Sequence, residues 1–143
     1  MEAPTRHAVL VAEDNAISRD MLMFQLEVLG FQAVAAEDGA AAARAWREGD
    51  FALLLTDLQM PGLDGYELAT LIRSEESVQR MPIVALTATA ANEEADRCVA
   101  VGMNGCLTKP ASLATLRRVV DRWIGPAATI ALVAADPGSG GAT

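Results

Sequence analysis

Short apolar runs alternate along the chain with segments of helical period. The first run, Ala8-Val9-Leu10-Val11-Ala12, is apolar throughout, as expected of a strand that is buried on both faces. Four more runs of this kind are typical of strands and cover residues 31–36, 51–56, 83–86 and 104–107. Because a helical segment follows each run, the pattern predicts an α/β fold in which helices cover both faces of a parallel sheet through right-handed crossovers.

The helical segments have recognisable ends. Asn15 can cap a helix that runs to about Leu29. The apolar residues of this helix recur at steps of four, three and four, which places them on one helical stripe: Ile17, Met21, Phe24 and Val28. The other helices are expected at about 38–48 and 66–74, between Asn92 and Gly102, and from Ser112 to a stop at Gly125-Pro126.

The length of 143 residues fits one domain. The strand and helix pattern fills residues 1–125, which we expect to form that domain. Residues 126–143 carry one charge, Asp136, and end in Asp-Pro-Gly-Ser-Gly-Gly-Ala-Thr. This composition predicts a flexible linker or tail.

Charge and apolar run lengths exclude several classes of partner. The net charge of −8 argues against direct nucleic-acid binding, which needs a surplus of Lys and Arg. The longest apolar runs fall far below the ~20 residues of a membrane helix, and the first residues lack the pattern of a signal peptide. A cytoplasmic location is expected. Ten of the 11 basic residues are arginine, so Lys109 is the single lysine of the chain.

Cysteine and histidine usage excludes further kinds of site. Cys98 and Cys106 lie eight positions apart and match neither a CxxC motif nor a zinc spacing. Free thiols in a reducing cytosol are one interpretation of this pair, and a disulfide is the other. His7 is the one histidine, which argues against a Ser-His-Asp triad or a histidine zinc site.

Polar residues gather where the predicted strands end. Glu13 and Asp14 follow the first strand, Asp57 follows the third, Thr87 the fourth and Lys109 the fifth. The carboxyl ends of parallel strands share one edge of the sheet, where open α/β folds bind ligands. Three acids, a hydroxyl and the one lysine should therefore converge.

This residue set suits phosphoryl transfer. Two carboxylates ~4 Å apart repel by about 4 kcal/mol at an effective dielectric of 20, so three together need a cation or take up protons. Mg²⁺ favours such an oxygen site. Lys109 and Thr87 can then hold phosphoryl oxygens by charge and hydrogen bonding. Asp57 is the best nucleophile candidate, because carboxylates can form aspartyl phosphates.

Four motifs at the strand ends resemble those of the receiver domains of bacterial two-component response regulators. They are Val9-Leu10-Val11-Ala12-Glu13-Asp14-Asn15, Thr56-Asp57-Leu58-Gln59-Met60-Pro61-Gly62-Leu63-Asp64-Gly65, Ala85-Leu86-Thr87-Ala88 and Thr108-Lys109-Pro110. The resemblance covers about residues 6–124. It implies a flavodoxin-like (βα)5 doubly wound sheet with strand order 2-1-3-4-5, a topology for which a receiver is itself a standard illustration.

The resemblance also implies residue roles. Asp57 would accept a phosphoryl group from the phosphohistidine of a histidine kinase. Asp14 and Asp57 would bind Mg²⁺ directly with the backbone carbonyl of Gln59, and Glu13 would act mainly through water. Lys109 would pair with Asp57 and then with the phosphoryl group, toward which Thr87 would move. The Lys109-Pro110 bond would be cis, a form adopted by only about 5–6% of X-Pro bonds.

Finer features are similar to receivers within hybrid sensor histidine kinases of the virulence-sensor type. Among them are Asp57-Leu58-Gln59-Met60-Pro61 and Gly102-Met103-Asn104. In such a phosphorelay Asp57 would pass its phosphoryl group to a histidine phosphotransfer domain. The chain would then be a self-phosphorylating acceptor rather than a turnover enzyme, in the cytoplasmic portion of a kinase. It departs from many receivers at Cys106, where they carry a switch Tyr or Phe three positions before the lysine.

Three alternatives stay open at this point. The chain could be a stand-alone single-domain response regulator. It could be a binding module that works without phosphorylation, although the complete set of acids, threonine and lysine argues against this. It could also be a Mg²⁺-dependent phosphatase. Such enzymes usually place a second acid two positions after the nucleophile, where this chain has Gln59.

Overall fold

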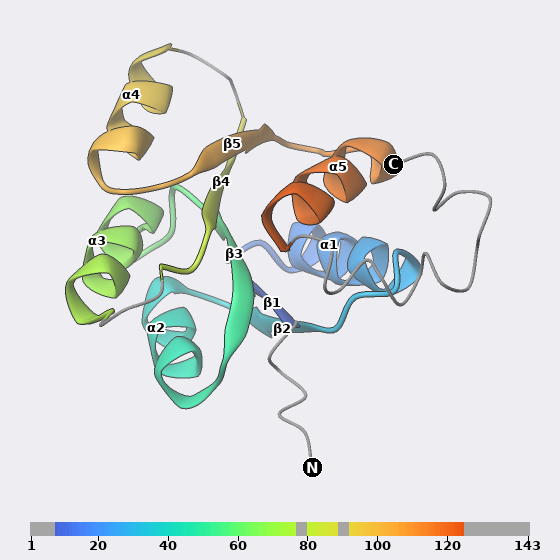
Figure 1. Ribbon diagram of the computed structural model, residues 1–143, viewed down its shortest axis with the longest axis horizontal. Coiled ribbons are helices and arrows are strands. Elements are labelled where there is room, and N and C mark those ends of the chain that lie inside the picture. Colours follow the sequence, from blue (N-terminus) through green and yellow to red (C-terminus); the bar gives the residue numbers. More distant parts are fainter. Residues whose placement is uncertain (1–7, 77–79, 89–91, 125–143) are drawn as a thin grey trace.

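The fold was analysed in a computed structural model that describes residues 8–76, 80–88 and 92–124 (Figure 1). The five strands are β1 (Ala8–Ala12), β2 (Ala33–Ala36), β3 (Phe51–Asp57), β4 (Ile83–Thr87) and β5 (Gly105–Thr108). The five helices are α1 (Ala16–Val28), α2 (Gly39–Glu48), α3 (Gly65–Glu75), α4 (Asn92–Ala100) and α5 (Leu113–Ile124). Strand and helix alternate as the hydrophobic pattern predicts.

All five strands form one parallel sheet in the order β2-β1-β3-β4-β5. The predicted fold class and strand order are therefore confirmed. Because the first connection leads to one side of β1 and the next to the other side, the strand order reverses between β1 and β3. The crevice outside the carboxyl ends of these two strands is where such folds bind ligands.

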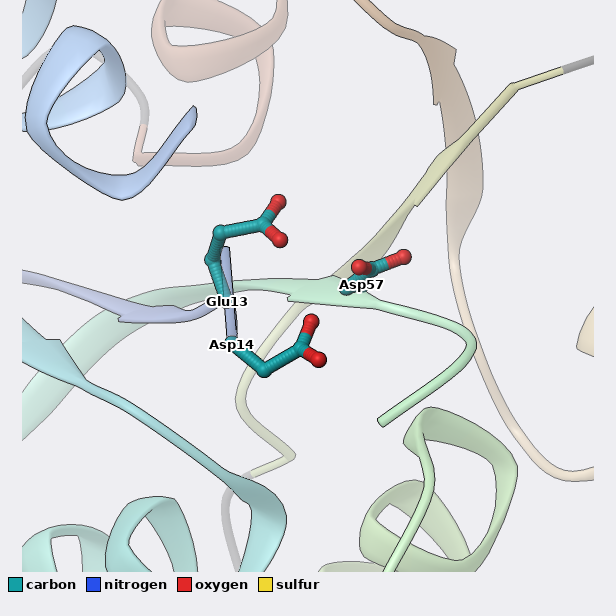
Figure 2. A group of neighbouring side chains, drawn as sticks. All are labelled: Glu13, Asp14 and Asp57. Carbon is teal, nitrogen blue, oxygen red and sulfur yellow. The ribbon is translucent and has the colours of Figure 1, made fainter. Parts of the chain in front are cut away.

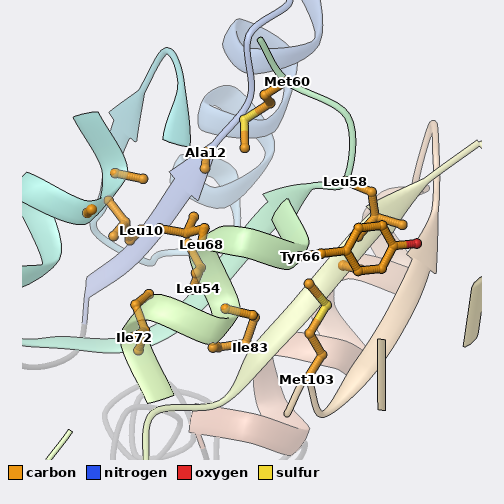
Figure 3. Packing of buried hydrophobic residues seen from close by; sticks show 14 of the residues in the cluster. Leu10, Ala12, Leu54, Leu58, Met60, Tyr66, Leu68, Ile72, Ile83 and Met103 are labelled. Atoms are coloured by element: carbon orange, nitrogen blue, oxygen red, sulfur yellow. The ribbon is translucent and has the colours of Figure 1, made fainter. Parts of the chain in front are cut away.

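The sheet is buried on both faces. Helices α1 and α5 cover one face and α2, α3 and α4 cover the other (Figure 1). Residues of β1 alternate between the two cores, with Val9 and Val11 facing α1 and α5 and Leu10 facing the other helices. Figure 3 shows Leu10 near Leu54 and Leu68 in the core between the sheet and helices α2, α3 and α4. Burial on both faces explains why the strand is apolar throughout.

Helix α1 departs from the simplest interpretation of its sequence pattern. The Asn15 side chain caps the helix as predicted, accepting a hydrogen bond from the backbone N–H of Ser18 at 2.9 Å. The predicted apolar stripe, however, faces solvent, with Ile17 77% and Phe24 64% exposed. A second apolar stripe packs on the sheet instead and consists of Leu22, Leu26 and Leu29. The helix has two apolar faces, and periodicity alone does not say which one the sheet covers.

The predicted domain boundary at residue 125 is untested, because residues 125–143, with the expected linker or tail, lie outside the part that the structure describes. Within the described ranges, the helices are all too short or too polar to cross a membrane.

Candidate functional site

The structure brings the predicted site residues to one edge of the sheet. Glu13 and Asp14 directly follow β1, Asp57 ends β3, Thr87 ends β4 and Lys109 follows β5. Figure 2 shows Glu13 and Asp14 from one strand end and Asp57 from the neighbouring strand end. One oxygen from each of the three carboxylates lies within 4.8 Å of the other two.

Lys109 bridges two of these acids. Its Nζ donates to Glu13 Oε1 at 3.0 Å and to Asp57 Oδ2 at 3.3 Å. The pairing with Asp57 was expected, but the shorter contact is with Glu13, whose side chain is fully buried. The second Glu13 oxygen accepts the backbone N–H of Asn15 at 3.1 Å. Lys109 thus links the ends of β1, β3 and β5.

Two members of this cluster, Glu13 and Lys109, have raised pKa values. Burial raises the pKa of Glu13, and the nearby Asp57 raises it further, against the lowering effect of Lys109 and the Asn15 N–H. For Lys109, burial alone would lower the pKa, but the hydrogen bonds and charges of Glu13 and Asp57 outweigh burial and raise it. Both shifts favour the proton-bound form, and hence added positive charge.

The donor set fits a divalent cation. The three carboxylates and one ammonium carry a net charge of −2 when all four are ionised. Asp14 is exposed and Asp57 half-buried, so solvent and an ion can reach the oxygens. Hard, oxygen-binding cations such as Mg²⁺ take one or two carboxylates plus waters. The acidic cluster of Glu13, Asp14 and Asp57 therefore has the chemistry that Mg²⁺ requires.

Thr87 has a partner that sequence reasoning missed. The threonine is buried, and its Oγ1 donates to Glu94 Oε1 of α4 at 2.6 Å. Glu94 lies in the first turn of α4, where the helix dipole favours an acid even if its side chain has no partner. The dipole is a sufficient explanation of Glu94 in the sequence, so nothing pointed to the contact with Thr87.

Backbone contacts hold the loops around the site. The Gln59 N–H donates to Asp57 Oδ1 at 3.4 Å, and the Lys109 N–H donates to the Thr87 carbonyl at 2.8 Å. The Lys109-Pro110 peptide bond is cis, as the resemblance to receivers implied. These contacts hold the loop after β3 against Asp57 and the loop after β5 against the end of β4.

Gly65 holds the Asp57 loop against the start of α3. Its N–H donates to the Leu58 carbonyl at 3.0 Å. A Cβ at this position would clash with the Asp57 carbonyl oxygen and lie 2.9 Å from Leu58 Cα. Asp64 caps α3 next to it and forms a capping box with Glu67. The close approach of these backbones requires glycine, which explains the Asp64-Gly65 pair.

Substituting Gly65 with alanine is therefore expected to destabilise the domain, although alanine is the better helix former. The clash involves backbone that cannot rotate away, and such overpacking costs about 1–3 kcal/mol. Gly105→Ala is the matched control, because a Cβ there meets no atom within 4 Å. Urea unfolding should show a lower midpoint for Gly65→Ala and an equal or higher one for Gly105→Ala. Equal midpoints for Gly65→Ala and the parent chain would contradict the close-approach argument.

Comparison with known proteins identifies the family. The family model for the response regulator receiver domain matches residues 9–121, which is most of the chain. The chain belongs to this receiver-domain family. The match includes both acids after β1, Asp57, Thr87 and Lys109.

Receivers of sensor proteins are among the relatives. The chain is 40% identical over 125 residues to the virulence sensor protein BvgS of Bordetella pertussis, a match that covers 84% of this chain and 10% of BvgS. The receiver thus spans about a tenth of the length of this curated relative. Similarity to a receiver of the virulence-sensor type, predicted from the motifs, is confirmed.

Two solved receivers share the fold closely. The receiver domain of sensor histidine kinase PA1611 from Pseudomonas aeruginosa, which holds a magnesium ion in its active-site cleft, has a TM-score of 0.76 and 36% identity. That alignment covers 82% of this chain and 97% of the other. The receiver domain of Ssk1 from Saccharomyces cerevisiae, crystallised with the histidine phosphotransfer protein Ypd1, has a TM-score of 0.75 and 32% identity. Here the alignment covers 83% and 89% of the two chains.

Proposed function

We propose that Asp57 of this receiver accepts a phosphoryl group from the phosphohistidine of a histidine kinase. An Asp57 oxygen attacks phosphorus, the new P–O bond forms, and the P–N bond breaks with its electron pair returning to the imidazole. The observation that carries the proposal is the convergence of three carboxylates and Lys109 at the ends of β1, β3 and β5. Asp57 is the acid of this group that ends the central strand β3 and contacts the lysine directly.

The acidic cluster is the proposed Mg²⁺ site. Asp14, Asp57 and the backbone carbonyl of Gln59 would hold the ion, and Glu13 would act mainly through water. Bound Mg²⁺ supplies positive charge to the phosphoryl oxygens during transfer. Two observations support this assignment: the clustered carboxylate oxygens, and the magnesium ion in the cleft of the PA1611 receiver.

Lys109 and Thr87 would bind the transferred group. The Lys109 ammonium already contacts Asp57 Oδ2. It could therefore pair with a phosphoryl oxygen once Asp57 is phosphorylated. Thr87 would release Glu94 Oε1 and turn its hydroxyl toward a phosphoryl oxygen, because a hydroxyl has one proton to donate. This exchange of partners would move the start of α4. It provides a readout that does not require an aromatic residue at Cys106.

The proposed context is a phosphorelay within a hybrid histidine kinase. The similarity to BvgS and to the receiver of a sensor histidine kinase supports this origin and a place in the cytoplasmic portion of such a kinase. Asp57 would then pass its phosphoryl group to a histidine phosphotransfer domain. The complex of the Ssk1 receiver with Ypd1 supports this kind of partner.

The surface beside the site suits a protein partner. A pocket of about 310 Å³ lies between α1 and the loop after β5, with Met21, Leu86 and Pro110 in its wall next to Lys109. The exposed stripe of α1 adjoins it through Met21, which is 49% exposed. A partner that buries this apolar surface would deliver its histidine to the strand ends. We place the phosphotransfer partner there.

Acetyl phosphate tests the proposal without a partner protein. Incubation with acetyl phosphate and Mg²⁺, followed by intact-mass measurement, should reveal one phosphoryl adduct, and chelation of the metal should prevent it. The adduct should be lost at alkaline pH, as expected of an acyl phosphate. No adduct under any condition would favour the binding module. Fast multiple turnover of unrelated phosphomonoesters would favour the phosphatase.

A further inference from the structure

The two cysteines lie side by side although they belong to different elements. Cys98 is on α4 and Cys106 on β5, and their sulfur atoms are 3.7 Å apart, with the Cys106 thiol donating to Cys98 Sγ. Both thiols are free. Their exposure differs sharply, because Cys98 is only 2% exposed whereas Cys106 is exposed to solvent. The Cys106 thiol is accessible to reagents, whereas the Cys98 thiol is buried in the core.

We propose that Cys98 and Cys106 form a reversible disulfide when the protein is exposed to hydrogen peroxide. The Cys106 sulfur attacks a peroxide oxygen, the O–O bond breaks, and a sulfenic acid and one water result. The Cys98 sulfur then attacks the Cys106 sulfur, the S–O bond breaks, and the thiol proton leaves with the hydroxide as a second water. Two thiols thus lose two electrons to one hydrogen peroxide.

The environment of the pair sets the order of these steps. Burial, and to a lesser degree the contact with the neighbouring Cys106 thiol, raises the pKa of the Cys98 thiol to about 12. Cys98 therefore stays protonated and shielded from peroxide, while Cys106 is the thiol that reagents reach. Once Cys106 carries the sulfenic acid, the neighbouring Cys98 sulfur is already in contact with it.

A bond between these sulfurs would fix the part of α4 that holds Thr87. Glu94 and Cys98 are four positions apart on α4 and so lie on the same face of the helix. Glu94 accepts the Thr87 hydroxyl, and Cys106 pairs in the sheet with Ala85, two residues before Thr87. The disulfide would join α4 to β5 in this arrangement and oppose the release of Thr87. This part of the inference rests on the proposed function.

The first experiment tests the disulfide itself on the whole chain. After treatment with hydrogen peroxide and denaturation, N-ethylmaleimide should add to neither cysteine, and after dithiothreitol it should add to both. Cys98→Ala should instead accumulate a dimedone-reactive sulfenic acid at Cys106, and Cys106→Ser should leave Cys98 unoxidised. Sulfenic acid in the parent chain without a disulfide, or only disulfides between chains, would overturn the inference.

The second experiment tests the consequence for the site. Amide hydrogen exchange in residues 92–100 should slow on oxidation, and affinity for beryllium fluoride with Mg²⁺, a phosphoryl analogue, should fall by roughly tenfold, within the range typical of coupled sites. By reciprocity the bound analogue should lower the equilibrium constant for disulfide formation by the same factor. The Cys98→Ala variant, treated identically, should show neither change.

The two proposals can fail separately. Unchanged exchange in α4, or equal analogue affinity in both redox states, would overturn the coupling while phosphorylation of Asp57 stands. If the analogue binds neither state, the proposed function fails, and the alkylation and exchange measurements still decide whether the disulfide forms and fixes α4.

Discussion

Replacing Asp57 with asparagine is expected to abolish phosphoryl uptake from acetyl phosphate. Asparagine has nearly the same shape as aspartate, but its amide oxygen carries no charge and is a very poor nucleophile. The acids of Glu13 and Asp14 stay in place, so the variant separates the acceptor from its neighbours. Intact-mass measurement after incubation with Mg²⁺ should show no adduct at times when the parent chain is largely modified.

The same substitution should stabilise the domain when Mg²⁺ is absent. Asp57 is repelled by two carboxylates at up to 4.8 Å, about 3.5 kcal/mol each at an effective dielectric of 20, against about 5 kcal/mol of attraction to Lys109 at 3.3 Å. Solvent screening reduces this difference, and we expect a gain of about 1 kcal/mol in unfolding free energy. Asp20→Asn, which removes an exposed acid of α1 outside the cluster, is the matched control.

A phosphoryl adduct on Asp57→Asn would place the acceptor elsewhere.

Replacing Lys109 with arginine should slow phosphorylation by about 10- to 150-fold although the charge is kept. This range corresponds to the loss of one charge-assisted hydrogen bond, about 1.5–3 kcal/mol. One ammonium nitrogen touches both Glu13 Oε1 and Asp57 Oδ2, and Glu13 is fully buried. A guanidinium is larger and planar and spreads its charge over three nitrogens, so it cannot occupy this point between two carboxylates. The measurement is the initial rate of adduct formation from acetyl phosphate.

The reverse exchange at the surface is the control for Lys109→Arg. Arg118 lies exposed on α5, away from the strand ends, and Arg118→Lys should phosphorylate at the parental rate. A parental rate for Lys109→Arg as well would show that the site needs only positive charge. The single lysine of the chain would then have no special role.

The strand ends could be predicted from the sequence because burial leaves a strong signal. A parallel strand covered on both faces must be apolar throughout, so a run such as Ala8–Ala12 ends where polar residues begin. Parallel strands also share one edge for all their carboxyl ends, which places Glu13, Asp57, Thr87 and Lys109 together without any knowledge of side-chain packing. The cis bond before Pro110 came from the family resemblance alone.

Contacts between elements could not be predicted in the same way. The bond from Thr87 to Glu94 and the contact between Cys98 and Cys106 depend on how α4 rotates against the sheet, and a sequence spacing does not define that rotation. The prediction from the apolar stripe of α1 was wrong for a related reason. Phe24 and Leu26 lie on opposite faces of the helix, both are apolar, and only the sheet decides between them.

The bond between Glu13 and Lys109 joins residues that are 96 positions apart along the chain. During synthesis Glu13 and Asp14 leave the ribosome first, and Lys109 follows only after β2, β3, β4 and β5 have been made. A fragment that stops short of β5 therefore lacks the ammonium that contacts both Glu13 and Asp57. The ion pairs that partly neutralise this acidic cluster are in this way a property of the finished chain.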